Sequence, residues 1–537
     1  MELIMDMVHD NPGEARTKTV FRQPETLLKL GYNTQIIKNI STIVDFSAMG
    51  EDFFPTPESK QWLQTMTDVL VGELTRAKAA GMMVMSHIDL FVLPKAMVDA
   101  YADALCDENG KISVWKEKTK EVHRVMLDEL FGKFGLDGLI IRVGETYLHD
   151  TPFHTGNGAV PYGDIPQEKE AFVELLNFLR EEVCQKHGKY LIFRTWDCKP
   201  DRFHADDSYY LDVTDRIAPH EKLIFSIKHT ALDFWRNVRF NPCLTIGKHR
   251  QVVEVQCQRE YEGKCAYPSY VMDGIINGFP ENALKKGLKD IMDDPHICGI
   301  YTWSRGGGWF GPYIQNEFWC ELNTYVISAY ACDHSRTEEE IFLEFAQNRM
   351  QLTPEDAKKF HTLCQKVQSA VLHGRYITAY DRSLNERRMP SLWTRDDRIG
   401  GLRQLNKVFD YLEPNGLVEE ALAEKELALT EWEEIAAGLN ALHIPDPVLG
   451  EFIRNSGEYA VRLYRLGLCC FRIFAKCRKL QNVRKLLLQY DRLWAEYKEL
   501  EGFPQASSSY CDQYIFSPDN LGLNETIAYC RQHLADE

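Results

Sequence analysis

The chain has 537 residues, 44% of them hydrophobic and 11% aromatic, and this length predicts two or three domains that each bury a core. Its formal net charge of −17 and the lack of a long basic run argue against nucleic acid and anionic membranes as partners. No apolar run approaches the roughly 20 residues of a membrane span.

Eight short apolar runs, bounded by Gly, Pro, Asp or Asn, are predicted to be buried parallel strands. They are Leu3–Val8, Asn33–Ile37, Met82–His87, Gly138–Val143, Tyr190–Thr195, Leu223–Lys228, Val252–Gln256 and Gly299–Trp303. Helical periodicity occupies the intervals between them, for example over Ser59–Ala80, Val114–Phe134, Gln167–Lys186 and Glu281–Met292.

Alternating strands and helices predict a parallel sheet, and eight strands over about 300 residues predict its closure into an α/β fold, the (β/α)8 TIM barrel. The alternative is an open, doubly wound sheet, which a glycine-rich dinucleotide fingerprint after the first strand would favour. The segment Asp10–Glu14 reads DNPGE, which is not that fingerprint. We therefore expect a barrel over residues 1–335.

From about Arg336 the strand-like runs stop and helical periodicity takes over, which predicts an α-helical C-terminal domain over residues 336–537. Thr353 is a predicted N-cap, because Pro354 and two acidic residues follow it. Long amphipathic stretches cover Glu419–Leu439, Pro447–Lys476 and Val483–Glu501. The segment Gly502–Gly522 is predicted to be irregular, before a last helix.

The 15 cysteines show no framework spacing and no CxxC motif, which predicts reduced thiols and a cytoplasmic protein. The first ten residues have neither the basic nor the apolar region of a signal peptide. No spacing in the chain is typical of a zinc site, and the chemistry considered below requires no metal or organic cofactor.

In a barrel of this kind, functional side chains lie at the C-terminal ends of the strands and in the loops that follow. Glu145 follows the fourth predicted strand, and it is a general acid, an exposed loop carboxylate or a helix-capping acid. Arg194 ends the fifth strand. It either binds a planar anion through its guanidinium or forms a structural ion pair within the barrel.

Lys228 ends the sixth strand, and Asp233 follows it by five residues, either as a catalytic carboxylate or as a solvated loop residue. Glu260 lies after the seventh strand. The eighth strand leads into a glycine-rich loop, and Trp303 and Trp309 on either side of it could stack on a sugar or cap the barrel.

Three carboxylates and two cations are thus predicted to converge on one rim. Two carboxylates on opposite sides of a glycosidic bond are the usual machinery of glycoside hydrolysis, with one protonated and the other ionised. A Lys–Arg pair beside them would recognise an anionic sugar, and it would lower the pKa of a nearby carboxylate, which suits a base.

Residues 138–350 resemble the catalytic barrel of glycoside hydrolase family 67, the α-glucuronidases. The segment Ile227-Lys228-His229-Thr230-Ala231-Leu232-Asp233 is similar to the strand-six motif of that family, in which a Lys precedes a catalytic Asp by five residues. The segment Gln258-Arg259-Glu260-Tyr261-Glu262-Gly263 is similar to the family's motif around a catalytic Glu.

The resemblance implies inverting hydrolysis of an α-linked uronic acid from an oligosaccharide, as part of polysaccharide degradation. It implies Glu145 as the general acid, Asp233 and Glu260 as the pair that activates water, and Arg194 and Lys228 as ligands of the uronate carboxylate. His229, Trp303 and Trp309 are further candidates for contacts with the substrate. The family precedent also suggests a homodimer formed through the helical domain.

The chain departs from the family in several places. We expect the usual N-terminal β-rich domain to be missing, because the first predicted strand starts within a few residues of Met1. Where the family has a Lys four residues before its acid, this chain has Ile141, with Arg142 next, and His9 replaces a Trp after strand one. A barrel glycosidase with another sugar specificity, and a non-catalytic carbohydrate-binding barrel, remain the alternatives.

Overall fold

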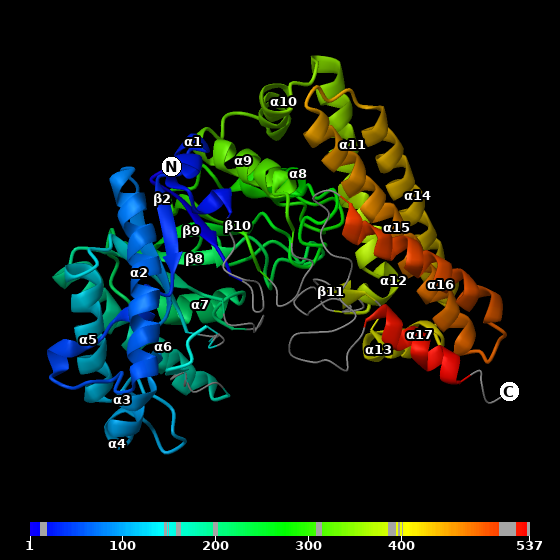
Figure 1. Ribbon diagram of the computed structural model, residues 1–537. Helices are drawn as coiled ribbons and strands as arrows, with labels where there is room; N and C mark the ends of the chain where they lie inside the picture. Colours follow the sequence, from blue (N-terminus) through cyan, green and yellow to red (C-terminus); the bar gives the residue numbers. More distant parts are fainter. Residues whose placement is uncertain are drawn as a thin grey trace.

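The computed structural model describes most of the chain in one continuous arrangement (Figure 1). The described residues are 1–10, 19–143, 146, 148, 150–156, 160, 163–196, 202–307, 314–384, 394–395, 398–399, 401–503 and 522–533. None of the helices in these ranges is both long and apolar enough to cross a membrane.

Eight parallel strands close into a barrel, and this confirms the predicted fold class. In chain order they are β1 (Leu3–Val8), β2 (Thr34–Lys38), β3 (Met83–Asp89), β5 (Gly138–Arg142), β7 (Tyr190–Arg194), β8 (Leu223–Lys228), β9 (Arg250–Gln256) and β10 (Ile297–Arg305). Around the barrel the strands follow chain order, and β1 closes it by pairing with β10 on one side and β2 on the other. Each predicted apolar run coincides with one of these strands.

Helices follow most of the strands and cover the outside of the barrel (Figure 1). They are α1 (Pro24–Lys29), α2 (Pro57–Ala79), α3 (Lys95–Ala100), α4 (Ala102–Leu105), α5 (Glu117–Gly132), α6 (Ile165–Leu179), α7 (Asp207–Thr214), α8 (Met272–Asn277) and α9 (Phe318–Cys332). The helix α2 starts at a reciprocal capping box, in which the Thr56 hydroxyl accepts the Ser59 N–H and the Ser59 hydroxyl accepts the Thr56 N–H.

The predicted helix over Glu281–Met292 is wrong. The structure forms a shorter helix upstream, α8, and only a single turn of 3-10 helix, Leu288–Asp290, within the predicted range. Lys285 has a positive φ of 44°, which interrupts any helix there. The amphipathic periodicity of this segment therefore reflects the burial of a few apolar side chains in an irregular loop.

The interior of the barrel changes character along its axis. Toward the N-terminal ends of the strands it is apolar, with Met5, Ile36, Met85, Ile140, Ile192, Ile224 and Val252 in one buried cluster. Alternate residues of a strand share a face, so Arg142 follows Ile140, Arg194 follows Ile192 and Glu254 follows Val252 into the interior. The layer nearest the mouth is therefore charged, on an apolar floor.

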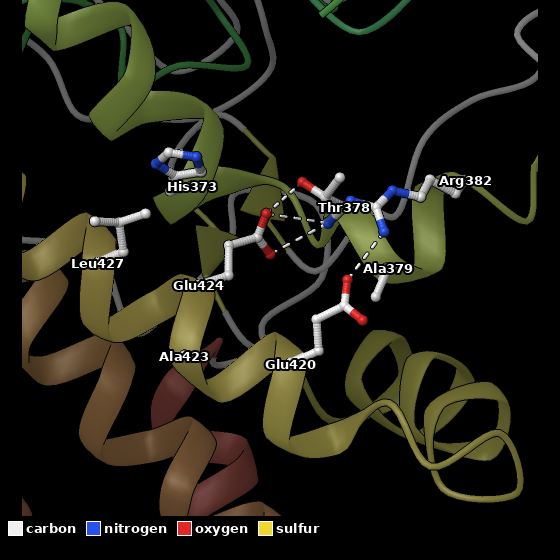
Figure 2. Close-up of a pocket in the computed structure, with 8 residues that line it drawn as sticks. All are labelled: His373, Thr378, Ala379, Arg382, Glu420, Ala423, Glu424 and Leu427. Atoms are coloured by element: carbon white, nitrogen blue, oxygen red, sulfur yellow. Dashed lines mark hydrogen bonds and ion pairs between the residues drawn. The ribbon is translucent and has the colours of Figure 1, made fainter.

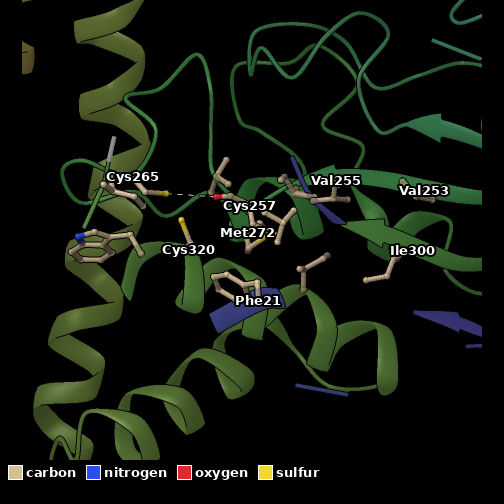
Figure 3. Close-up of a cluster of buried hydrophobic side chains, with 14 of the residues drawn as sticks. Phe21, Val253, Val255, Cys257, Cys265, Met272, Ile300 and Cys320 are labelled. Atoms are coloured by element: carbon tan, nitrogen blue, oxygen red, sulfur yellow. Dashed lines mark hydrogen bonds between the residues drawn. The ribbon is translucent and has the colours of Figure 1, made fainter. Parts of the chain in front are cut away.

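The outer faces of β9 and β10 pack against α8, α9 and the turn at Val20–Arg22 (Figure 3). Val253, Val255 and Ile300 lie in this cluster with three buried cysteines, Cys257, Cys265 and Cys320. The Cys265 thiol donates to the Cys257 carbonyl at 3.7 Å. This hydrogen bond joins the first residue of the loop after β9 to a later residue of the same loop.

A helical region follows the barrel, and its long helices lie beside one another (Figure 1). The helices in the described part of this region are α10 (Glu338–Arg349), α11 (Pro354–Arg375), α12 (Thr378–Asp381), α13 (Leu402–Leu412), α14 (Val418–Ala441), α15 (Pro447–Cys477), α16 (Arg484–Lys498) and α17 (Leu523–Gln532). Thr353 caps α11 as predicted, accepting the Asp356 N–H at 3.1 Å. The division of the chain at residue 335 stays a prediction.

The described residues also contain short antiparallel strand pairs, which were not predicted. The strand β4 (Val92–Pro94) pairs with β6 (His154–Gly156), and β11 (Thr394–Arg395) pairs with β12 (Arg398–Ile399). Most of Gly502–Gly522 lies outside the described residues.

Candidate active site

Two buried ion pairs form the charged layer beneath the mouth of the barrel. Arg194 on β7 is bound through two nitrogens by Glu254 on β9, with Nε–Oε2 and Nη2–Oε1 distances of 2.9 and 2.5 Å. Arg142 on β5 is bound in the same way by Asp89 on β3, at 2.5 and 2.7 Å. The ion pair considered for Arg194 is therefore present, whereas its role as a substrate ligand stays a prediction.

The layer also holds two histidines in a positively charged environment. Burial and then the charge of neighbouring cations hold the pKa of His87 and of His9 well below the ordinary value, so both imidazoles are neutral. The Arg194 guanidinium lies 3.3 Å from His87 Nε2, and the Lys38 ammonium lies 3.3 Å from His9 Nε2. Burial and the charge of Arg142 lower the pKa of Lys38 to about 8.

Asp233 lies in the loop after β8 with three hydrogen-bond donors around its carboxylate. Lys228 Nζ lies 2.6 Å from Oδ1, the Phe234 N–H donates to the same oxygen at 3.0 Å, and the Tyr261 hydroxyl donates to Oδ2 at 2.6 Å. Burial favours the neutral acid, but the Lys228 charge and these donors outweigh it and lower the pKa of Asp233. Asp233 is therefore ionised at neutral pH, while its side chain keeps 15% of its surface exposed.

The structure brings the loops of Asp233 and Glu260 together. Tyr261, the residue after Glu260, reaches Asp233, and the Arg259 guanidinium donates to the Phe234 carbonyl at 2.6 Å. The Glu260 N–H donates to the Gln256 side-chain oxygen at 3.0 Å. These bonds hold the ends of β8 and β9 in one arrangement, with both carboxylates at the mouth.

Gly307 packs closely against this arrangement from the end of β10. Its φ of +104° lies in the region that favours glycine, and an added Cβ would lie 2.3 Å from Gln256 Nε2 and 3.2 Å from a Glu260 carboxylate oxygen. A glycine at position 307 therefore allows close packing beside Glu260.

Trp303 and His229 also lie at the mouth. The Trp303 ring stacks on His9, with centroids 5.2 Å apart, and meets the edge of Phe234 at 5.7 Å. Burial, with the charges of Arg259 and Lys228, holds the pKa of His229 well below its usual value. The imidazole of His229 is therefore neutral.

Several buried nitrogens around the mouth have no hydrogen-bond partner among the described residues. They are His87 Nδ1, His229 Nε2, Gln256 Nε2 and Trp303 Nε1. An unsatisfied buried polar group costs free energy, so such groups usually meet a ligand or an ordered water. Hydroxyl groups of a sugar are suitable partners for N–H donors of this kind.

Glu145 and Trp309 lie outside the described residues, so their predicted roles stay predictions. Of the other predicted residues, the structure places Lys228, His229, Asp233, Glu260 and Trp303 at the mouth, and Arg194 in the charged layer beneath it. Within the described part of the chain, no group of three or more His, Cys, Asp or Glu side chains could hold a metal ion.

The prediction missed His87, Asp89, Arg142, Glu254 and Tyr261. A signal for the first four was present, because each is a polar residue two positions after an inward-facing residue of an apolar strand. Arg142 occupies the interior face and Ile141 the outer core, so Arg142 is the cation that β5 contributes to the mouth. Tyr261 had no signal of this kind.

A pocket lies in the helical region, between α12 and α14 (Figure 2). Its volume is about 300 Å³, and its lining residues come only from positions 373–427. Glu424 accepts the Thr378 N–H and hydroxyl, and Glu420 pairs with Arg382. Its charged groups thus serve contacts between the helices, and the barrel mouth is the better candidate for chemistry.

No protein-family model and no curated protein sequence matches the chain. A solved structure of a GH138 enzyme targeting pectin rhamnogalacturonan II is 11% identical, with a TM-score of 0.54 over 100% of this chain and 83% of that one. The GH84 protein CpGH84B is 11% identical, with a TM-score of 0.42 over 99% and 76% of the two chains. An O-GlcNAc hydrolase from Thermobaculum terrenum is 11% identical, with a TM-score of 0.37 over 100% of this chain and 94% of that one. At such identity, the GH138 likeness shows a shared fold.

Proposed function

We propose that this protein is a glycoside hydrolase that releases an α-linked uronic acid from an oligosaccharide with inversion of configuration. The observation that carries the proposal is an ionised Asp233 on a loop that is hydrogen-bonded to the loop of Glu260, at the C-terminal mouth of a barrel. This is where barrel enzymes carry their chemistry.

The proposed roles follow from the ionisation of each group. Inverting hydrolysis needs one carboxylate that deprotonates water and one carboxylic acid that protonates the leaving oxygen. Asp233 accepts hydrogen bonds at both oxygens, including one from a cation, so it suits the base and not the acid. Glu260 acts with it on the water, and Glu145 is proposed as the acid.

The electrostatics of the mouth support an anionic sugar. Although the chain carries a net charge of −17, cations lower the pKa of both His9 and His87 at the charged layer, after burial. A uronate carboxylate would be stabilised by this positive field. Arg194 and Lys228 contribute charge to it while each is already paired with a protein carboxylate, so they would act on the substrate mainly through that field.

The unpartnered nitrogens of the mouth would form hydrogen bonds with the hydroxyl groups of the sugar. Trp303 Nε1, Gln256 Nε2 and His87 Nδ1 are buried, and they would donate to ring hydroxyls. The buried His229 Nε2 would donate or accept according to the tautomer of its neutral ring. The GH138 neighbour, described as targeting pectin rhamnogalacturonan II, supports a glycan as the class of substrate.

The test compares 4-nitrophenyl α-glucuronide and α-galacturonide with the matching neutral α-glycosides. We expect kcat/KM to favour the uronosides. Asp233→Asn and Glu260→Gln should each lower kcat by about 10²- to 10⁴-fold, because each removes a group that acts on water. The control is Glu170→Gln, since Glu170 lies exposed on α6 in an ion pair with Arg216.

Proton NMR of the freshly released sugar should show the β-anomer first. If both mouth variants hydrolyse every active uronoside as fast as the wild type, the assignment of Asp233 and Glu260 is wrong. Equal kcat/KM for uronosides and neutral glycosides would instead refute the substrate class and leave the mechanism standing.

A further inference from the structure

The loop after β8 carries Asp233 and extends from the barrel to the helical region. The Arg236 N–H donates to the Tyr376 hydroxyl at 3.3 Å, and the Arg236 guanidinium donates to the Gln368 carbonyl on α11. Asn237 Nδ2 donates to the Asp381 carboxylate on α12 at 3.1 Å. Arg236 is 2% exposed, so its bonds are shielded from water.

An aromatic cluster joins the same two parts of the molecule. It contains Trp196, Trp235 and Tyr261 from the barrel loops and Tyr376 from the end of α11, all of them buried. The Trp235 and Tyr261 rings pack with centroids 4.2 Å apart. Tyr376 is the fully buried member that the helical region contributes, and Leu372 packs against the cluster from the same helix.

Tyr261 connects this cluster to the carboxylate. Its ring lies in the cluster and its hydroxyl donates to Asp233 Oδ2 at 2.6 Å. Lys228, which holds the other carboxylate oxygen, lies with its ammonium 3.5 Å from the centroid of the Trp196 ring. Two of the donors that orient Asp233 are therefore themselves packed by the cluster.

Barrel residues hold the first part of the loop. His204 lies 3.1 Å from the Thr230 carbonyl and 3.3 Å from the Leu232 carbonyl, and Asn241 donates to the Thr230 carbonyl at 3.1 Å. The part after Asp233 is held from both sides. Arg236 Nε donates to the Glu281 carboxylate at 2.8 Å, and Asn282 donates to the Val238 carbonyl at 3.2 Å. The bonds of Arg236 and Asn237 to the helical region are added to these barrel contacts. The loop beyond the carboxylate is therefore held jointly by the barrel and the helical region.

We propose that the helical region is a positioning element of the active site: Tyr376, with the anchors of Arg236 and Asn237, holds the loop and the Tyr261 ring so that Asp233 keeps its two side-chain donors. The positioning stands on these contacts, and only the role of Asp233 as a base rests on the proposed function. Among the described residues, the titratable groups around Asp233 are Lys228 on β8, Tyr261 after β9, and His204, whose imidazole burial keeps neutral.

The test follows Asp233 with and without turnover, in the full-length protein. Aspartate labelled with ¹³C at the carboxyl carbon reports the pKa of Asp233 by NMR, and the signal is assigned by its loss in Asp233→Asn. The variants are Tyr261→Phe, which removes the donor, and Tyr376→Ala, which removes the ring from the helical region. Tyr464→Phe is the control, because it removes another buried hydroxyl between the two parts, 3.0 Å from that of Tyr267.

We expect Tyr261→Phe to raise the pKa of Asp233 and to move the acid limb of kcat/KM upward. Tyr376→Ala should move both in the same direction and lower kcat at least ten-fold, with a smaller change in KM. Tyr464→Phe should lower the melting temperature without moving either. If Tyr376→Ala does not fold, the double variant Tyr376→Phe/Asn237→Ala removes two anchors and keeps every ring of the cluster.

If Tyr376→Ala, or the double variant Tyr376→Phe/Asn237→Ala, folds and Asp233 keeps its wild-type pKa, the proposal is wrong. If no glycoside is hydrolysed by the wild type but the pKa still moves, the positioning stands and the proposed function fails. If hydrolysis is found but neither the pKa nor the acid limb moves, the proposed function stands and the positioning fails.

Discussion

Lys228 and Asp233 form an ion pair at the mouth of the barrel, and this pair favours the ionised form of Asp233. The ammonium lies 2.6 Å from the carboxylate, and both groups are largely shielded from water. Burial alone would favour a neutral Asp233, so the sign of its shift is set by the partners that oppose burial. At the scale of single residues, the strongest expectations therefore concern Lys228.

Replacing Lys228 by Gln should raise the pKa of Asp233, because burial remains while the charge and its hydrogen bond are lost. A lowered pKa contributes stability above the unfolded-state value, and this stability is lost as pH falls through the folded-state value. In Lys228→Gln we expect a lower free energy of unfolding at pH 7. The acid limb of kcat/KM should move up by about 1 to 3 pH units.

The control for this prediction is Lys169→Gln, which removes a lysine from α6 that pairs with Asp212. It should leave the pH profile of kcat/KM unchanged. A Lys228→Gln variant with a wild-type acid limb would show that Lys228 does not set the ionisation of the group that limits activity.

At the scale of elements, the strands were predictable and their partners across the barrel were not. A buried parallel strand needs an apolar run between chain breakers, and each of the eight runs satisfied this. The predicted helix at Glu281–Met292 failed because Lys285 takes a left-handed conformation, which periodicity does not encode. The candidate residues Asp233 and Glu260 were predictable from their places after strands.

The pairing of Arg194 with Glu254 could not be predicted from the sequence, for a different reason. The two residues lie on β7 and β9 with β8 between them, so their contact depends on the stagger of the closed barrel. Tyr261 was missed in the same way, because its hydroxyl reaches a carboxylate 28 positions earlier in the chain. Spacing along one chain does not reveal contacts that closure creates.

Removing one partner of the Arg194–Glu254 pair should lower the free energy of unfolding more than replacing both partners by apolar residues. Glu254→Gln leaves a buried guanidinium without its counter-charge, and we expect a loss of about 3–5 kcal/mol in the free energy of unfolding, measured with denaturant. The double variant Arg194→Met/Glu254→Leu should be closer to the wild type, since both charges are gone. Glu170→Gln, which breaks the exposed pair with Arg216, should cost about 0–1 kcal/mol.

At the scale of the whole molecule, closure of the barrel places a buried carboxyl group at its seam. Asp6 on β1 accepts hydrogen bonds from the Thr302 and Ser304 hydroxyls on β10, both at 2.7 Å. Burial, only partly offset by these donors, raises the pKa of Asp6 to about 6. The stability of the fold is therefore linked to the protonation of a group outside the active site.

The sign of this linkage follows from the raised pKa. The protonated form stabilises the fold fully below about pH 4, and this stability is lost as pH rises through about 6. Asp6→Asn does not titrate at this position. Between pH 4 and 7 its free energy of unfolding should therefore gain about 3 kcal/mol relative to the wild type.

Denaturant midpoints across that pH range provide the measurement. Ser304→Ala removes one donor to the ionised form, so it should move the pH-dependent region upward. A constant difference between Asp6→Asn and the wild type at every pH would mean that Asp6 keeps one protonation state throughout.

The bonds from the loop after β8 to α11 and α12 also determine which segment of this chain a chimeric protein would have to contain. The hydrogen-bonded cylinder is complete at β10, so by topology it is a self-contained module. The loop that bears Asp233, however, is fastened to residues more than a hundred positions later in the chain. A chimera that receives the barrel must therefore also receive α11 and α12. The barrel alone closes as a fold, but it lacks the helices that hold the loop of Asp233.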